Sequence, residues 1–187
     1  MHKNEEGFSY IDTMIGIVIL LVGILALAAA VTTSVIRSRE SEQQLIAKQL
    51  ANSTLESIFS ARDIRLNGED GWNSIGNIGS NPVDGVPKGI FVIGQAPIRD
   101  SAGADGMIGT LDDACAGTGP CCVSGVCNSS AILAGFKRQV TITDINDPER
   151  PTPPWPILMR RIEITIFYQA SNTIRQEKVA TVITSYQ

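Results

Sequence analysis

Four aspartates in a glycine-rich stretch are the residues of this chain best suited to binding chemistry. They lie between Asp100 and Asp113 in the sequence DSAGADGMIGTLDD, which has no basic residue. Calcium takes about six to eight oxygen ligands, and small residues allow carboxylates and backbone carbonyls to turn inward. The spacing does not match the EF-hand loop. We therefore predict a calcium-binding loop over residues 100–113, and the alternative is a solvated acidic turn.

Four cysteines follow this loop within a short stretch. Cys115, Cys121, Cys122 and Cys127 allow three disulfide connectivities, and a bridge between the adjacent Cys121 and Cys122 would be strained. Two pairings stay open: Cys115–Cys121 with Cys122–Cys127, or Cys115–Cys122 with Cys121–Cys127. Four thiolates could also hold zinc, but the spacing C-x5-C-C-x4-C is not that of a zinc ribbon. We predict disulfides that hold together a Cys-rich loop over residues 115–127.

The distribution of histidine and of charge argues against enzymes and nucleic-acid-binding proteins. The one histidine is His2, so neither a His-dependent catalytic pair nor a His-ligated metal site is available downstream. The formal net charge is −4 and no basic patch stands out, so nothing indicates nucleic-acid binding. We expect a non-enzymatic protein.

The elements that must position these loops begin with a hydrophobic run from Gly7 to Ile36. Its one charged residue is Asp12, and the part from Met14 onward exceeds the length of about 20 apolar residues that spans a bilayer. A secretory signal peptide has a shorter apolar core of about 7–15 residues. The run therefore predicts a retained transmembrane helix over residues 8–36.

The charges that flank this run do not suit an exported C-terminal domain. Arg37 and Arg39 follow the run, whereas the leader has Lys3 beside Glu5 and Glu6. The positive-inside rule, applied alone, would keep the large C-terminal part in the cytoplasm.

The run begins with a short motif. Gly7 is followed by the aromatic Phe8, then by Asp12 five positions after the glycine, and then by an unbroken hydrophobic stretch. This motif resembles the class III signal of type IV pilins and pseudopilins. The resemblance implies that a prepilin peptidase cuts after Gly7 and methylates Phe8. The leader peptide 1–7 then stays in the cytoplasm while the body is exported. The pattern GIVILLVGILALAAA, with the later LANSTLESIFSAR, is most similar to PilV-type minor pilins. The family usually has Glu where this chain has Asp12.

This resemblance implies a structural role. The chain would be a minor pilin of a type IV pilus or related filament, in which Asp12 offsets the positive charge of methylated Phe8. Its partners would be the prepilin peptidase, other pilin subunits and inner-membrane assembly proteins, and it would reside in the inner membrane before it joins an extracellular pilus. The alternatives are a minor pseudopilin of a type II secretion or DNA-uptake machine, within a periplasm-spanning pseudopilus, and a signal-anchored calcium-binding module that never polymerises.

The acidic stretch resembles the calcium loop of the major pseudopilin of type II secretion, which pairs an Asp-Gly with a downstream Asp-Asp. On that resemblance Asp105, Asp112 and Asp113 would supply side-chain ligands to Ca²⁺. Nearby backbone carbonyls would complete the coordination shell, and Asp100 would be an extra ligand.

Beyond the membrane segment the sequence predicts that the helix continues through an amphipathic part, residues 37–64. No proline or glycine interrupts residues 34–62. Apolar residues recur there at helical spacing, namely Ile46, Ala47, Leu50, Ala51, Leu55 and Ile58. Thr54 and Ser57 interrupt that face. We expect one helix from Ser9 to Arg62, with its outer half packed on a sheet.

The remaining residues, 65–187, predict an exported β-rich domain. Glycines and prolines between residues 67 and 88 indicate a long surface connection, in which Trp72 packs against the domain. Four β-like segments follow, at 89–97, 136–145, 157–169 and 173–185, with a hairpin turn at Ser171–Asn172 and a proline-rich loop at 147–156. The predicted fold is α+β, with the long helix packed on an antiparallel sheet of about four strands.

Overall fold

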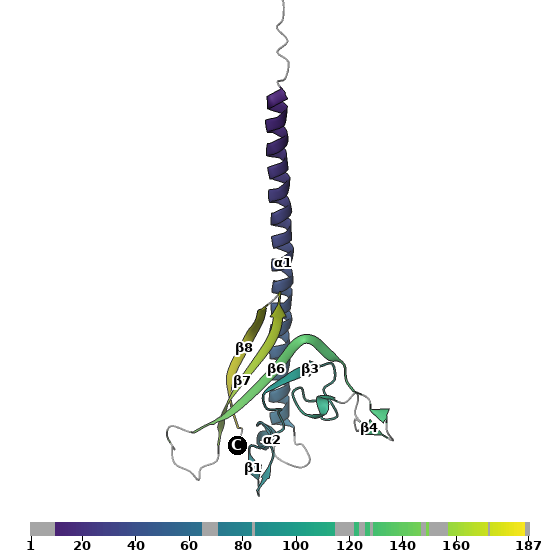
Figure 1. Cartoon of the computed structure of the whole chain (residues 1–187). Coiled ribbons are helices and arrows are strands. Elements are labelled where there is room, and N and C mark those ends of the chain that lie inside the picture. Colours follow the sequence, from purple (N-terminus) through teal and green to yellow (C-terminus); the bar gives the residue numbers. More distant parts are fainter. Residues whose placement is uncertain are drawn as a thin grey trace, which may run out of the picture. The chain divides into compact units, whose positions relative to one another are not determined.

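A single long helix, α1, opens the structure of this protein, a computed structural model (Figure 1). The structure describes residues 10–64, 71–83, 85–114, 122–123, 126–127, 129–146, 149, 157–171 and 173–185. The leader, Gly7, Phe8 and all but one residue of the proline-rich loop 147–156 lie outside the described residues. The chain divides into two compact units, Met1–Glu42 and Gln43–Gln187, and each is described separately below.

Helix α1 covers Tyr10–Asp63, 54 residues, and ends one residue beyond the predicted Arg62. It contains no proline, and glycine occurs only at Gly16 and Gly23, so nothing in the sequence breaks the helical hydrogen bonds. In the first unit every described residue from Tyr10 to Arg39 is exposed. From Thr13 to Ile36 this part of the helix has no charged residue and carries apolar side chains on all sides, which is typical of a helix that is covered by lipid or by other helices.

In the second unit, α1 presents a narrow buried stripe. Its buried residues are Ala47, Ala51, Thr54, Ser57, Ile58 and Ala61. The predicted face is confirmed at Ala47, Ala51 and Ile58. Thr54 and Ser57, the two polar residues of that face, are buried with it. The Thr54 hydroxyl donates to the Leu50 carbonyl oxygen within α1, and the Ser57 hydroxyl accepts the Ile108 N–H.

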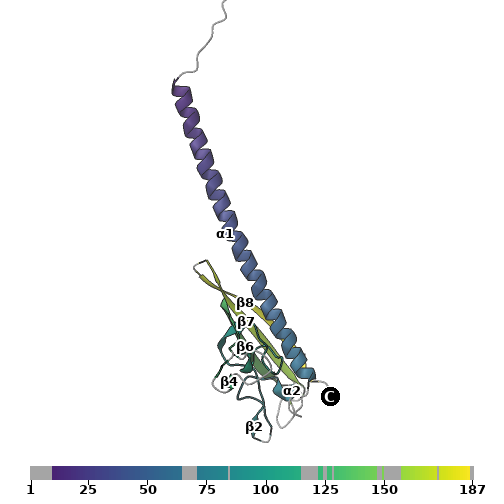
Figure 2. The ribbon, with the colours of Figure 1, turned by 90° about the vertical axis from the view of Figure 1, so that its right-hand side faces the viewer.

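The sheet has four antiparallel strands in the order β3-β6-β7-β8. The strands are β3, Gln95–Arg99; β6, Ile132–Ile145; β7, Met159–Ala170; and β8, Thr173–Thr184. Figure 2 shows them beside the C-terminal part of α1. The central strand β7 points Ile162, Ile164 and Ile166 into the core, and all three are fully buried. Each contributes about 1.5–3 kcal/mol of hydrophobic stabilisation, so β7 anchors the α+β core.

The predicted strands are confirmed apart from their ends. Strand β6 begins four residues before the predicted Phe136, and β3 begins at Gln95 rather than at Gly89. Residues 89–92 instead bond to the preceding connection and to Gly109. The β7–β8 hairpin pairs Ala170 with Thr173, and Ser171 at its tip has a φ of 52°, as two-residue hairpin loops require.

The connection before β3 is more ordered than the sequence indicated. It contains the short helix α2, Gly71–Ser74, and a two-stranded ladder of β1, Pro82–Val83, with β2, Val86–Pro87. The Asn77 side chain donates a hydrogen bond to the Val140 carbonyl oxygen (2.8 Å) and accepts one from the Ile142 N–H (2.9 Å). The pairing of β6 with β3 ends at Gln139. Beyond that point the Asn77 amide makes the two backbone hydrogen bonds that a neighbouring strand would otherwise make.

Trp72 packs against the domain as predicted. It is buried, and its indole N–H donates to the Ile157 carbonyl oxygen at 2.8 Å. The guanidinium of Arg160 lies 4.5 Å from the centre of the Trp72 ring. Arg160 also donates to the Ile75 carbonyl and to Asp144, so one arginine fixes α2 to β6 and β7.

Candidate functional site

The first candidate site is the exposed apolar part of α1. Asp12 lies in the first turn of the described helix, where the positive end of the helix dipole stabilises a carboxylate. Gly7 and Phe8 lie outside the described residues. Among the described helices, α1 is the one that is long and apolar enough to span a membrane, and none of that segment is buried in the chain itself. So large an apolar surface must be covered by lipid or by protein.

Two hydroxyl groups within this part of α1 bond to the helix itself. Thr32 and Thr33 donate their hydroxyls to the Ala28 and Ala29 carbonyl oxygens, at 2.9 and 2.7 Å. These bonds remove the need for water, which is absent from a bilayer core or a helix bundle. A Cβ added at Gly16 or Gly23 would meet nothing within 4 Å, so both positions are open to a neighbouring helix or to lipid.

The second candidate site is the acidic loop, residues 100–113. Asp112, at the start of the 3-10 helix η1, Asp112–Ala114, organises it. One carboxylate oxygen accepts the N–H groups of Ala104 (2.7 Å) and Asp105 (3.0 Å), and the other accepts the Thr110 hydroxyl (2.5 Å). Gly103 has a φ of +66°, and a Cβ there would lie 2.4 Å from the Asp112 carboxylate. Only glycine allows the loop to close so tightly around this side chain.

The other aspartates also bond within the protein. Asp105 accepts the Met107 N–H at 2.7 Å. Asp100 exchanges two hydrogen bonds with Ala131, because its carboxylate accepts the Ala131 N–H and its own N–H donates to the Ala131 carbonyl. Asp100 therefore fixes the start of the loop to the residue before β6.

Asp113 forms a buried ion pair with Arg138 on β6. Its carboxylate lies 2.9 Å from the guanidinium, and the two side chains are 8% and 4% exposed. The same carboxylate oxygen accepts the Gly109 N–H at 2.8 Å. Burial raises the pKa of the Asp113 carboxyl, and the Gly109 hydrogen bond and the Arg138 charge oppose that rise. Arg138 also lies within hydrogen-bond distance of Thr54 on α1, at 3.5 Å.

Ser57 joins the loop to α1 directly. Its hydroxyl oxygen accepts the Ile108 N–H at 2.7 Å, beside the buried Met107. Together with the Arg138 pair, this contact fastens the loop to both α1 and β6. The sequence prediction missed Arg138, Thr54 and Ser57. The sequence did hold a signal, since each of the three lies on a face whose other residues are apolar. Arg138, for example, is two residues before the buried Val140 and therefore points to the same side of β6.

The four aspartates, as placed, suit a loop closed by its own hydrogen bonds better than an oxygen cage. Two N–H groups point at one Asp112 oxygen, and the Asp113 charge is already neutralised by Arg138. Among the described residues, no group of three or more acidic, histidine or cysteine side chains is placed to hold a metal ion. Calcium binding at Asp100, Asp105, Asp112 and Asp113 stays a prediction.

The variant Asp105→Asn separates a loop closed by its own hydrogen bonds from a loop that binds calcium. Burial, and to a smaller extent the Asp112 charge, raise the pKa of Asp105. A carboxyl whose folded-state pKa is raised loses stabilising effect as the pH rises through that pKa. In chelator we therefore expect Asp105→Asn to raise the melting temperature slightly at pH 7, because the amide keeps the acceptor for Met107 and removes the charge. The gain should vanish below about pH 4, where the carboxyl is protonated in both states.

The same variant tests calcium. If the loop binds Ca²⁺, the native chain gives heat in titration calorimetry and melts at a higher temperature in calcium than in chelator, and Asp105→Asn loses both effects. Absence of heat and an unchanged melting temperature would end the calcium prediction.

The Cys-rich loop is described only in part. Cys115 and Cys121 lie outside the described residues, and of the side chains of Cys122 and Cys127 nothing is described. The backbone forms a small ladder of β4, Cys122–Val123, with β5, Val126–Cys127, in which Cys122 pairs with Cys127. Directly opposed residues in an antiparallel pair have Cα atoms about 4.5–5.5 Å apart, which suits a disulfide.

This register favours Cys122–Cys127 with Cys115–Cys121 over the other open pairing. We expect peptide mapping of the unreduced chain to recover the Cys122–Cys127 bridge, with no cysteine open to alkylation before reduction. Recovery of a peptide that joins Cys115 to Cys122 would show the alternative pairing, and four alkylated thiols would exclude disulfides.

Comparison of the chain with models of protein families, with curated proteins and with solved structures found no match. The features that bear on function are therefore the residues near the N-terminus, α1 and the domain that contains the C-terminal part of α1.

Proposed function

We propose that this chain is a structural, non-enzymatic subunit of a type IV pilus or related filament, most like a minor pilin. The observation that supports this proposal best is the division of α1 into an exposed apolar part and a part that packs on a sheet. One uninterrupted helix carries an exposed apolar part and then a stripe that packs on a four-stranded antiparallel sheet. This arrangement serves a subunit that rests in a membrane and later joins other subunits through the same surface.

The proposed mechanism starts at the membrane. The prepilin peptidase cleaves after Gly7 and methylates Phe8, and the subunit stays in the inner membrane with its C-terminal domain exported. Assembly transfers the apolar surface of α1 from lipid to neighbouring helices, where Asp12 compensates the charged amine of Phe8. Transfer from lipid to protein yields no hydrophobic gain, so close helix packing and this charge pair must supply the specificity.

Co-expression with and without a prepilin peptidase tests the proposal. With the peptidase we expect the mass to fall by the seven leader residues and to rise by one methyl group on Phe8. Gly7→Val should stay uncleaved in the same cells, and Gly16→Val is the matched control that should be cleaved normally. A chain that keeps its leader in both strains would contradict the proposal and favour a plain membrane anchor.

The same family offers a close alternative, a minor pseudopilin of a type II secretion or DNA-uptake machine. It shares the peptidase and the assembly helix, so the processing experiment does not separate it. The location of the assembled subunit separates the two functions. A pilus subunit is recovered in sheared surface filaments, and a pseudopilin stays with the cell envelope.

A further inference from the structure

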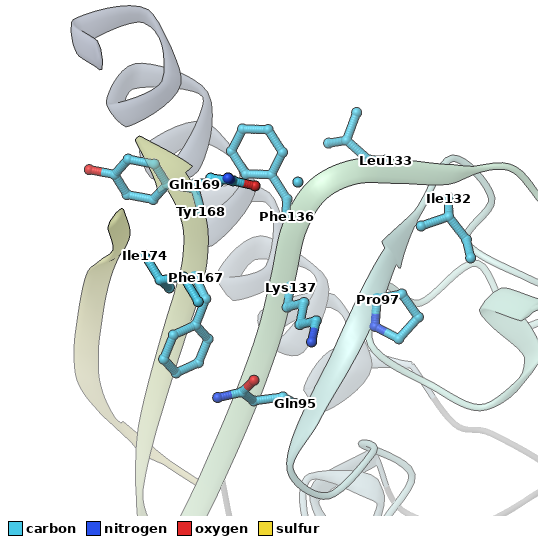
Figure 3. A pocket seen from close by; sticks show the side chains of 11 residues that line it. Gln95, Pro97, Ile132, Leu133, Phe136, Lys137, Phe167, Tyr168, Gln169 and Ile174 are labelled. Atoms are coloured by element: carbon cyan, nitrogen blue, oxygen red, sulfur yellow. The ribbon is translucent and has the colours of Figure 1, made fainter. Parts of the chain in front are cut away.

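An apolar groove of about 450 Å³ lies at one end of the sheet, formed by β3, β6, β7 and the start of β8 (Figure 3). Aliphatic and aromatic side chains make most of its lining, among them Pro97, Ile132, Leu133, Phe136, Phe167 and Ile174. Ile174 and Ile132 remain 78% and 55% exposed. Its volume falls in the range of about 300–1,000 Å³ that small-molecule sites occupy.

An irregularity in the sheet lies at this groove. Pro97 pairs with Lys137, but Arg99 pairs with Ile132, so two steps along β3 correspond to five steps along β6. Gly135, with a φ of 84°, lies within the surplus residues. Leu133, among these surplus residues, lines the opening together with Phe167, which is on the same face of the sheet as its strand neighbour Lys137. Phe136 stacks with Tyr168 on the other face and borders the opening at the end of the sheet.

One charged side chain, Lys137, lies among the described residues that line the groove. Its strand neighbours on either side are Pro97 and Phe167, so two apolar residues flank Lys137 across the sheet. Figure 3 shows Lys137 between these two residues, with Gln95 nearby. On the same sheet Lys178 is paired with Glu163 at 2.6 Å. Lys137 has no ion-pair partner in the described part of the chain.

We propose that this groove binds a small amphipathic anion, with its hydrocarbon body against the apolar lining and its carboxylate at the Lys137 ammonium. The charge complementarity selects the anion, because the described lining offers one cation and no acid. The amide groups of Gln95 and Gln169 lie at the same opening and provide further hydrogen-bond donors. This ligand site is separate from α1 and does not depend on filament assembly.

The test uses the full chain in lipid nanodiscs, with isoleucine methyl groups labelled for NMR. Octanoate is the probe, and octanol and octylammonium are its uncharged and cationic counterparts. We expect saturable shifts of the Ile132 and Ile174 methyls with octanoate, while the core methyl of Ile162 stays fixed. Octanoate should bind more tightly than hexanoate, by about fourfold for each methylene that becomes buried.

Two variants assign the contacts. Lys137→Met should weaken octanoate by about threefold to fivefold, as for a solvent-accessible ion pair, and leave octanol unchanged. Lys178→Met is the matched control and should leave octanoate binding unchanged. Phe167→Ser should weaken both ligands.

Several outcomes would overturn the proposal. These are shifts that do not saturate, equal affinity for octanoate and octylammonium, or an unaffected Lys137→Met variant. Tighter binding of a short acidic peptide than of octanoate would also overturn it, since the groove would then be a peptide site. None of these outcomes bears on cleavage after Gly7.

Discussion

Replacing Arg138 with methionine should lower the free energy of unfolding by about 3–5 kcal/mol. The change leaves the Asp113 carboxylate buried without its counter-charge, with only hydrogen bonds from the loop to stabilise it. It also removes a side chain that joins the loop to both β6 and α1. Denaturant unfolding of the full chain in mild detergent, followed by tryptophan fluorescence, measures the loss.

The double variant Arg138→Met with Asp113→Asn should be more stable than Arg138→Met alone, because no buried charge then lacks a partner. Arg161→Met is the matched control. Arg161 lies on the neighbouring strand β7 in an ion pair with Glu163, but it is 55% exposed, so its loss should cost at most about 1 kcal/mol. Equal losses for Arg138→Met and Arg161→Met would show that the buried pair has no special role.

The loss in Arg138→Met should also depend on pH. Burial already raises the pKa of Asp113 in the native chain, and removal of the Arg138 charge raises it further. A raised folded-state pKa contributes stability at low pH that disappears as the pH rises through that pKa. The gap between the variant and the native chain should therefore narrow below about pH 4.

On the proposed pilin function, Asp12→Ala should reduce recovery of the chain in sheared filaments by at least about tenfold, which corresponds to about 1.4 kcal/mol of lost preference for the assembled state. Asp12 is the one charge between Tyr10 and Ile36, so in that segment it is the group that would compensate the proposed amine of Phe8. Under the same proposal cleavage and methylation should continue, because the variant leaves Gly7 and Phe8 unchanged. Immunoblots of filament and membrane fractions measure the distribution.

Two variants control for a general effect of charge. Asp12→Glu should still assemble, since it keeps the carboxylate. Glu42→Ala removes an exposed acid from the same helix outside the apolar segment and should assemble normally. Undiminished recovery of Asp12→Ala in filaments would show that the charge pair is not needed.

Local patterns were sufficient to predict most of the fold. Helix α1 follows from a long apolar run and an amphipathic continuation that contain no proline, and β7 follows from the alternation of isoleucine with Glu163 and Thr165 between Ile162 and Ile166. Both signals lie within one element and need no knowledge of distant partners. The glycines and prolines between residues 67 and 88 hid α2, because short helices are stabilised mainly by tertiary contacts such as that between Trp72 and Arg160.

The interior of the candidate site could not be predicted in the same way. Asp113 and Arg138 are 25 residues apart in the chain, and Thr54 lies 84 residues before Arg138. Composition shows an acidic loop, but it does not show which acid meets a cation. A serine on an apolar helix face looks like an interruption in the sequence. The role of Ser57 becomes visible only when its partner, the Ile108 N–H, is known.

The Asn77 amide has a consequence for how copies of this chain meet. It occupies the carbonyl of Val140 and the N–H of Ile142, the groups through which an incoming strand would begin to pair with β6. Open strand edges are a common start of aggregation. Asn77 therefore takes up two of the backbone groups on the edge of β6 at which another copy of the chain could begin to pair.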